Sequence, residues 1–276
     1  DKGEVVECEI PEYSQNNLGI CTDALMEAVA ETSEEFMERY FNGDEFSENE
    51  IRQALRVNVA DASMVPVSMG SSILAQGMYT LLDDIIKYFP SPDKRSCTGI
   101  NAKSNEVYSA DYDFSKPKSA YIFKTIVDPF IGKYSLIKVN SGVLKTDDLL
   151  FNHHRDTEGR IGKLYVMCGS KPQEVPELHA GDIGALAKLS GAMTTDSLST
   201  KANPILFIRT SISEPYTGMR YKAKNKGDED KISQALQKIM QEDLTIKTVN
   251  DSANHQTLIY GIGEQQLEVL VETLKN

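Results

Sequence analysis

The sequence predicts a multidomain fold of α/β, all-β and α+β parts, because the spacing of apolar residues changes twice along its 276 residues. Steps of three and four residues, typical of amphipathic helices, dominate up to residue 92. From residue 119 apolar and polar residues alternate, which indicates short β-strands. From residue 203 strand and helix patterns alternate, and the total length is typical of two or three domains.

The N-terminal part, residues 1–92, begins with a predicted turn-rich and partly extended stretch over residues 1–20. A helix is predicted from Thr22 up to Gly43, because glycine takes the left-handed conformation that ends helices. Ser47–Glu50 forms a capping box, in which the serine hydroxyl and the glutamate carboxylate satisfy free amides of a first helical turn. A second helix is therefore predicted to begin there.

The rest of this part predicts a buried strand over Met64–Ser68 and a helix that begins after Gly77 and ends at Pro90. A single strand with three helices does not make a sheet, so we interpret residues 1–92 as the last portion of an α/β domain. Residues 93–118 contain few apolar residues and many charges, and they are predicted to be a linker or a loose edge of the next domain.

Residues 119–202 predict a small β-barrel. Two longer strands, Ala120–Val127 and Tyr134–Val139, are joined across Asp128–Gly132. Further short strands are predicted at 149–152, 161–167, 177–179 and 183–189. Many short strands separated by regular turns are typical of such a barrel.

Residues 203–276 predict a split βαβ sandwich of the ferredoxin-like type. The predicted order is two strands (205–211 and 216–223), a helix (228–241), two more strands (245–250 and 257–260) and a helix that begins after Gly263. In this motif a helix connects two strands, and a further strand and helix follow.

The charge is uneven: the chain carries a net charge of −12, and residues 1–118 hold 22 acidic and 10 basic side chains. This acidic first part argues against nucleic-acid contact there, because phosphates would be repelled, whereas the remainder is neutral overall and can still carry local basic patches. Neither a membrane span nor a signal-peptide pattern is present in this sequence. The cysteines are widely spaced and form no CxxC motif, which favours reduced thiols in the cytoplasm.

The sequence contains neither the GxxxxGK[ST] phosphate loop nor the GxGxxG dinucleotide motif, and no catalytic constellation is complete. His153 and His154 are adjacent, so they are predicted to point apart in a surface turn and not to share a metal. Basic residues gather at Arg155, Arg160 and Lys163, and again over residues 220–231.

In the strand that begins at Arg220, alternate basic residues, Arg220 and Lys222 first among them, share one face. That face can lie on a phosphate backbone or be an ordinary solvated surface, and the sequence leaves both open.

Pro66–Ser72 is similar to the fifth guanine-site motif of a GTPase, and Tyr88–Pro92 is similar to the end of a GTPase domain. Together with further segments, in order along the chain, they resemble the elongation factor G family. The start of the family's second domain is similar to Ile126–Gly132 with Val139–Leu144. The remaining matches are His179–Ile183 (AGDI turn), Thr194–Leu198 (TTGDTL, with the glycine missing here), Ile212–Pro215 (opening of the third domain) and Gly261–Glu264 (GxGE turn).

The resemblance implies a fragment that covers the C-terminal part of a P-loop GTPase domain with its insertion (1–92), a linker (93–118), a translation-factor-type barrel (119–202) and a third domain (203–276). In the full-length parent, the guanine side of the nucleotide would lie against Gly70, Ser71 and Ser72, and GTP or GDP with Mg²⁺ would be the cofactors. The fragment would bind none of them and would not hydrolyse GTP alone, because the P-loop, switches and NKxD motif are missing.

The implied function is GTP-dependent tRNA–mRNA translocation on the ribosome, by a cytoplasmic, monomeric protein that contacts small-subunit RNA and protein. Candidate ribosome-facing residues are Asp128, Pro129, Phe130, Gly132, Gly181, Asp182, Arg220 and Lys222. A ribosomal-protection GTPase, which displaces tetracycline, and a non-enzymatic ribosome-binding module are the alternatives. A self-contained enzyme that uses the acidic N-terminal helices, or an adaptor with protein partners, would be functions of other classes.

Overall fold

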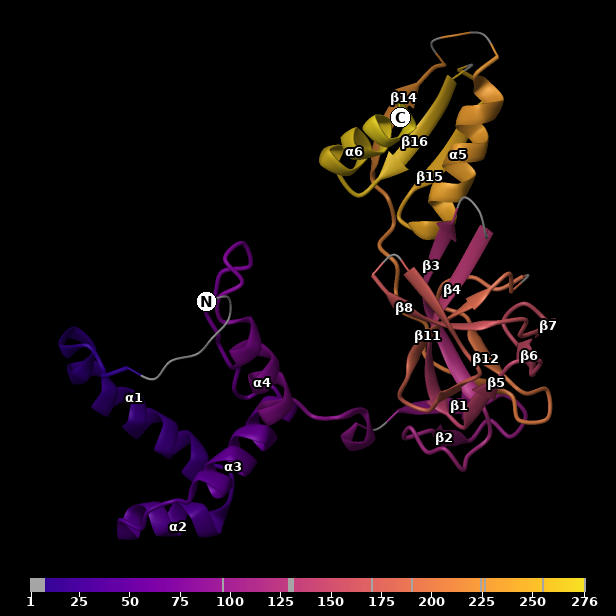
Figure 1. Ribbon diagram of the computed structural model, residues 1–276. Coiled ribbons are helices and arrows are strands. Elements are labelled where there is room, and N and C mark those ends of the chain that lie inside the picture. The colour runs from indigo at the N-terminus through magenta and orange to yellow at the C-terminus, as the bar shows by residue number, and fades with distance from the viewer. Residues whose placement is uncertain are drawn as a thin grey trace. The chain divides into compact units, whose positions relative to one another are not determined.

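The computed structural model describes residues 8–95, 97–128, 132–169, 171–189, 191–223, 225, 227–254 and 256–275. The chain divides into two compact units, Asp1–Lys94 and Arg95–Asn276, which are described separately below and are labelled by element in Figure 1.

The first unit is helical, with α1 (Glu12–Ala30), α2 (Glu34–Asn42), α3 (Glu48–Ala60) and α4 (Met78–Tyr88). The predicted capping box at the start of α3 is confirmed, because Ser47 and Glu50 each bond to the other's backbone amide. Gly43 ends α2 with a φ of 82°, as predicted. The predicted end of α4 at Pro90 is also close, since the helix stops at Tyr88.

Three predictions for this unit are wrong. The first helix begins at Glu12 instead of Thr22, and Ser33, which accepts a hydrogen bond from the Phe36 amide, begins a new helix where one continuous helix was predicted. No described residue of Met64–Ser68 is in a strand. Val65 and Val67 are exposed, and a strand without a partner cannot satisfy its backbone groups.

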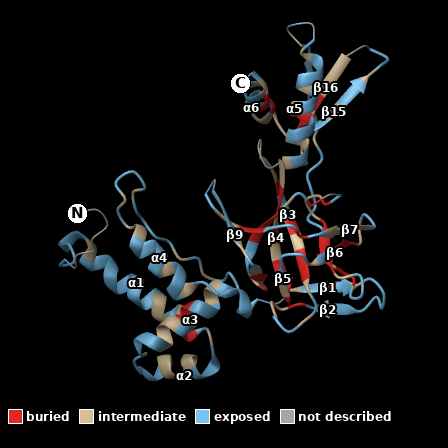
Figure 2. Cartoon of the chain, turned by 45° about the vertical axis from the view of Figure 1, so that its right-hand side comes forward, coloured by how far each residue is buried: buried red, intermediate tan, exposed pale blue. Residues whose placement is uncertain are grey.

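The core of the first unit is small. Val29, Ala54 and Leu55 are buried, and the partly buried side chains that pack against them are Leu25, Phe36, Phe46, Ile51, Met64 and Tyr88. On α4, by contrast, Leu82 and Ile86 are largely exposed. Figure 2 shows the same contrast in colour, with few buried segments among these helices and many in the strands of the second unit.

The second unit begins with a small sheet. The short helix η1 (Pro92–Lys94) ends the first unit, and β1 (Thr98–Asn101) then pairs with β2 (Val107–Ser109) and with β13 (Ile205–Leu206). The segment that was predicted to be a linker or loose edge therefore contributes two strands. Both strands are short and have few apolar residues, and β13, the second partner of β1, lies about a hundred residues further along the chain.

An eight-stranded antiparallel sheet follows, in the order β7-β6-β12-β3-β4-β11-β8-β9. Its strands are β3 (Ser119–Asp128), β4 (Gly132–Ser141), β6 (Leu149–Asn152), β7 (Thr157–Arg160), β8 (Leu164–Cys168), β9 (Lys171–Val175), β11 (Ile183–Ala187) and β12 (Ser197–Ser199). A separate pair joins β5 (Val143–Lys145) to β10 (Glu177–His179). Most of the predicted strands are thus present, and the pairings run from β7 at one end to β9 at the other.

The main core lies on one face of this sheet, because strand side chains alternate between faces. Ala120 pairs with Val139 and Ile122 with Ile137, and all four are fully buried. The register of β3 against β4 shifts between Ile122 and Lys124. Beyond that bulge, Ile126 packs in a different cluster, with Tyr134 and Tyr165.

The last part of the chain has the order β14 (Thr217–Tyr221), α5 (Glu229–Glu242), β15 (Lys247–Asp251), β16 (Gln256–Gly261) and α6 (Glu264–Lys275). The sheet order is β14-β16-β15, so β16 splits the βαβ unit as predicted. The buried residues Leu236, Ile246, Ile259, Leu267 and Leu270 join the helices to the sheet. The strand predicted at 205–211 is only two residues long and belongs to the β1 sheet instead.

Thr195 precedes β12 with a φ of 76°, in the left-handed region that a β-branched residue rarely adopts. Its amide donates to the carbonyl of Ile122 at 2.7 Å, which holds the backbone in place. This is the segment in which the family motif carries a glycine and this sequence does not. The conformation therefore stores strain that glycine would not have.

We predict that amides of residues 8–90 exchange hydrogen faster than those of residues 119–200, because the first unit has so few buried apolar side chains. Hydrogen exchange followed by mass spectrometry of peptides from both segments measures this. Equal protection of the two segments would contradict it.

We predict that Thr195→Gly raises the free energy of unfolding by about 1 kcal/mol, since the relieved left-handed strain exceeds the added chain entropy of glycine. Urea denaturation measures the change. Thr195→Ala keeps a Cβ and serves as the control, with a smaller gain expected. A glycine variant less stable than the wild type would show that Thr195 is not strained.

Candidate functional site

The predicted nucleotide-binding residues Gly70, Ser71 and Ser72 form a tight loop in the first unit. The amide of Ser71 donates to the Gln76 carbonyl and the Gln76 amide returns the bond, both at 3.0 Å. A Cβ built on Gly70 would lie 2.6 Å from the Gln76 oxygen, so this position admits only glycine without a shift. The loop is a defined turn, and its contact with a guanine stays a prediction.

Asp128 ends β3 and Gly132 begins β4, and the two residues pair with each other. Gly132 has a φ of 95° with open space around its missing Cβ, so its requirement for glycine is conformational. Pro129 and Phe130, which were predicted to be part of the same surface, lie outside the described residues.

Gly181 and Asp182 form the tight turn that joins β10 to β11. The carboxylate of Asp182 accepts a hydrogen bond from the His179 amide at 2.8 Å, and its own amide donates to the His179 carbonyl at 2.9 Å. Gly181 has a φ of 94°, and its amide donates to the Val139 carbonyl at 2.7 Å. The turn is thus bound to β4.

These two turns lie at opposite ends of β4. Gly132 begins that strand, whereas Asp182 bonds through its carbonyl to the amide of Val139. Seven residues of extended strand separate them, roughly 23 Å at about 3.3 Å per residue. One ribosome-facing surface that includes both turns would have to run the length of the strand.

Arg220 and Lys222 are both exposed. Met219 and Tyr221, which alternate with them, pack against the buried core between the sheet and its helices. The predicted alternation is therefore confirmed for the described residues. Two further basic residues of the predicted stripe, Lys224 and Lys226, lie outside them.

The strand register places two further residues, which were not predicted from the sequence, on the exposed sheet face that carries Arg220 and Lys222. This face is called the open face below. Tyr260 lies directly across from Gly218 on one side and from Lys247 on the other. A Cβ on Gly218 would come within 2.9 Å of the Tyr260 ring, so the ring lies close over the glycine. Lys247 also pairs with Glu214. An exposed sheet face with an aromatic ring between cations is a known platform for nucleic acids.

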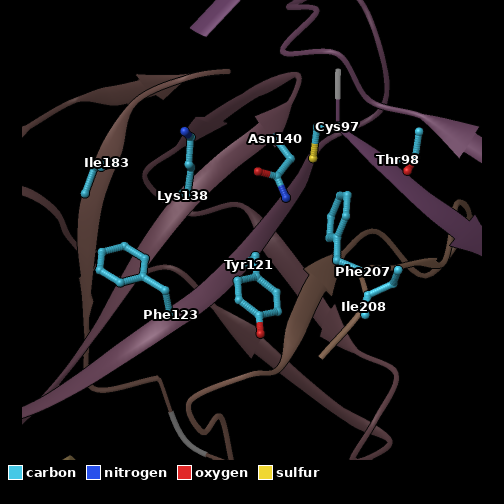
Figure 3. Close-up of a pocket in the computed structure, with 9 residues that line it drawn as sticks. All are labelled: Cys97, Thr98, Tyr121, Phe123, Lys138, Asn140, Ile183, Phe207 and Ile208. Carbon is cyan, nitrogen blue, oxygen red and sulfur yellow. The ribbon is translucent and has the colours of Figure 1, made fainter. Parts of the chain in front are cut away.

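A shallow pocket of about 400 Å³ lies on the other face of the eight-stranded sheet, away from the main core. Figure 3 shows its lining, with Tyr121 and Phe123 from β3, Lys138 and Asn140 from β4, and Phe207 and Ile208 from the segment after β13. Burial raises the pKa of the Cys97 thiol at its edge, which disfavours the reactive thiolate. The pocket is apolar, and its lining contains no nucleophile paired with a base.

Asp196 is the most highly connected charged group of the second unit among the described residues. Its fully buried carboxylate accepts hydrogen bonds from Asn152 Nδ2 at 2.7 Å, Arg155 Nε at 2.7 Å and the Met193 amide at 3.0 Å, all to Oδ2. Arg209 Nη2 donates to Oδ1 at 2.6 Å. Burial raises the pKa of Asp196, but the hydrogen bonds from Asn152, Arg155 and Met193 outweigh it and hold the pKa below its ordinary value.

His153 and His154 lie in the turn after β6, as predicted, but both are half-buried instead of lying on the surface. Burial lowers the pKa of each. Within the described ranges, His, Cys, Asp and Glu side chains nowhere gather in a group of three or more that could hold a metal ion. Among the helices of those ranges, none combines the length and apolar character that crossing a membrane requires.

We predict that Asp196→Asn lowers the free energy of unfolding by about 2 kcal/mol, because it leaves Asn152, Arg155 and Arg209 without their shared anion. Since the folded-state pKa of Asp196 is depressed, its stabilisation is present above pH ~4 and is lost as the pH falls through the folded-state pKa. The variant should therefore lose stability less steeply in acid.

Urea denaturation between pH ~3 and pH ~7, a range that spans the ordinary aspartate pKa, measures both effects. Asp147→Asn is the control, since Asp147 is exposed and lies 3.7 Å from Arg160, an ion pair worth little. An Asp196→Asn protein as stable as the control at neutral pH would contradict the assignment.

Two family models match the chain. Residues 117–201 match elongation factor G domain 2, and residues 212–276 match elongation factor G, domain III. The first match contains every strand of the large sheet, and the second contains the whole βαββα unit.

A solved structure is also similar over the whole chain. It is a crystal structure of a protein from Thermus thermophilus, with a TM-score of 0.79 and 27% sequence identity. The match covers 100% of this chain and 39% of that one, so the chain spans well under half the length of its structural relative. The protein is therefore similar to elongation factor G and contains the second and third domains of that family.

Proposed function

We propose that this chain belongs to a translational GTPase that drives tRNA–mRNA translocation on the ribosome, and that its own part is to bind the small subunit. The observation that carries the proposal is the presence of domains 2 and III of elongation factor G, in that order, over residues 117–201 and 212–276. The protein would then work in the cytoplasm, as a monomer, against a ribosome occupied by tRNA.

The finer structural predictions belong to the same proposal. The eight-stranded sheet, whose end strands are β7 and β9, would close into a translation-factor barrel. Residues 1–92 would be the end of a GTPase domain. The exposed apolar residues of α4, such as Leu82 and Ile86, support this, because a helix that covers a parallel sheet carries such a face. The boundaries at 93, 119 and 203 stay predictions.

The nucleotide would bind the longer protein and not this chain alone. Gly70, Ser71 and Ser72 would supply backbone on the guanine side, but the sequence has no phosphate loop and the described residues form no Mg²⁺ ligand cluster. This chain alone is not expected to bind GTP, GDP or Mg²⁺, because its sequence lacks the phosphate loop that would hold the phosphates.

Binding to the ribosome would use the open face of the β14-β16-β15 sheet. Arg220 and Lys222 point away from the core and can lie on phosphates, which position a protein without reading sequence. Tyr260 offers a ring on which a base can stack. The turns at Asp128–Gly132 and Gly181–Asp182 would make separate contacts, since β4 lies between them.

A non-enzymatic ribosome-binding module is the second candidate, because the described residues contain no complete catalytic constellation. It shares the binding surface with the first candidate and differs in acting without a GTPase. A ribosomal-protection relative that displaces tetracycline would also share it.

We predict that the purified chain binds small ribosomal subunits and that affinity falls steeply with salt. Replacing both Arg220 and Lys222 by Gln should weaken binding about tenfold or more and reduce the salt slope by roughly 1.4 to 1.8, since each lost phosphate contact contributes ~0.7–0.9. Co-sedimentation at several salt concentrations measures this.

The matched control replaces Lys145 and Lys171 by Gln, which removes the same charge from exposed side chains of β5 and β9, outside this sheet. An unchanged salt slope in that control is expected. If the wild-type chain shows no salt-sensitive binding at low salt, the proposed function fails, and if both double variants lose affinity equally, the sheet face is not the contact.

A further inference from the structure

Arg155 and Arg209 come from different segments of the second unit and meet at one buried carboxylate. Arg155 follows β6, and Arg209 follows β13. Arg155 Nε lies 2.7 Å from Asp196 Oδ2, and Arg209 Nη2 lies 2.6 Å from Asp196 Oδ1. The side chain of Asp196 is fully buried, while those of Arg155 and Arg209 are 36% and 46% exposed.

In this geometry Asp196 orients both guanidinium groups, and each group remains partly exposed to solvent. A guanidinium group carries five N–H donors in a rigid plane, and the hydrogen bonds to Asp196 use Arg155 through Nε and Arg209 through one terminal nitrogen. The side chains of Arg155 and Arg209 are 36% and 46% exposed, so part of each guanidinium plane can be reached from solvent. Because Asp196 fixes the planes before any ligand arrives, little side-chain entropy is lost when they bind an anion.

The charges around the carboxylate do not cancel. Asp196 contributes one negative charge against Arg155, Arg209 and the nearby half-buried Lys133, whose ammonium group donates to the Ala192 carbonyl. His154 feels the charges of Asp196, Arg155 and Arg209, and its pKa is lowered by burial, so it adds no fixed charge. The acidic residue next in sequence, Asp156, is exposed. A buried carboxylate needs one cation for neutrality, and here the surplus is positive.

We propose that Arg155 and Arg209 form a clamp for a phosphodiester group of RNA, with Asp196 as the residue that positions both. Planar guanidinium groups bind phosphate oxygens through paired hydrogen bonds, which a single ammonium group cannot do. In a chain of net charge −12, which repels RNA overall, contact with RNA requires such a local positive site. That the RNA is ribosomal rests on the proposed function.

The first test uses small phosphates and needs no ribosome. The Nε–Hε NMR signals of Arg155 and Arg209 should shift saturably with dimethyl phosphate, a model of the RNA backbone, and more tightly with a short RNA hairpin. Arg160, exposed and 3.7 Å from Asp147, is the internal control and should not shift. Shifts with inorganic phosphate alone would overturn the assignment to RNA in favour of a free phosphate site.

The second test measures small-subunit binding of Arg155→Gln and Arg209→Gln across salt concentrations. Each variant should bind about five- to tenfold more weakly, with the salt slope reduced by close to one, while Arg160→Gln stays within about twofold of the wild type. Should a Gln variant fail to fold, Arg155→Lys and Arg209→Lys keep the charge at Asp196 but lose the planar fork, and a weakened hairpin complex is expected from them.

The outcomes separate this inference from the proposed function. Wild-type binding to the subunit with no change in any of the four variants would overturn the clamp and leave the proposed function standing. Shifts of the Arg155 and Arg209 signals with dimethyl phosphate and RNA, without any subunit binding, would support the clamp and overturn the proposed function. A stability loss without any change in affinity would make the arginines structural only.

Discussion

The antiparallel ladder of β3 and β4 is the interaction on which most of the second unit depends. Nine pairs of residues join these two ten-residue strands, and β12 and β11 add to their outer edges. One face of the ladder buries Ala120, Ile122, Ile137 and Val139 in the main core. The two turns that resemble family motifs lie at its ends, so the length of β4 also sets how far apart their contacts can be.

Charge is the second constraint, because an acidic protein that binds RNA must concentrate its cations. The described residues do so in two places, on the open face that carries Arg220 and Lys222 and around the buried carboxylate of Asp196. The first place depends on strand alternation alone. The second depends on one buried anion, which orients two arginines and neutralises only one of their charges. Both would weaken as salt rises, which is the behaviour expected of contacts with phosphates.

Much of the fold could be predicted from periodicity. The helices α3 to α6, the longest strands and the split βαβ order follow from local patterns, such as the capping box at Ser47 and the alternation in Ala120–Val127. The predictions that failed concern elements whose partners are distant in the sequence or whose local pattern is weak. The helix from Glu12 contains Asn and Gly residues that disfavour helices, and the strand predicted at Met64–Ser68 has no partner among the described residues. The strand β1 pairs with the distant β13, and the bulge in β3 leaves no mark in the sequence.

The sequence by itself determined the split βαβ order of the last part and the resemblance to the second and third domains of one family, because both depend on residues close together in the chain. It also determined that Arg220 and Lys222 share a face, since strand side chains alternate. Only the tertiary structure decided that Tyr260 and Lys247 join that face and that Arg155 and Arg209 meet at Asp196. The physical reason is that strand register and a buried carboxylate bring together residues whose separation along the chain carries no signal.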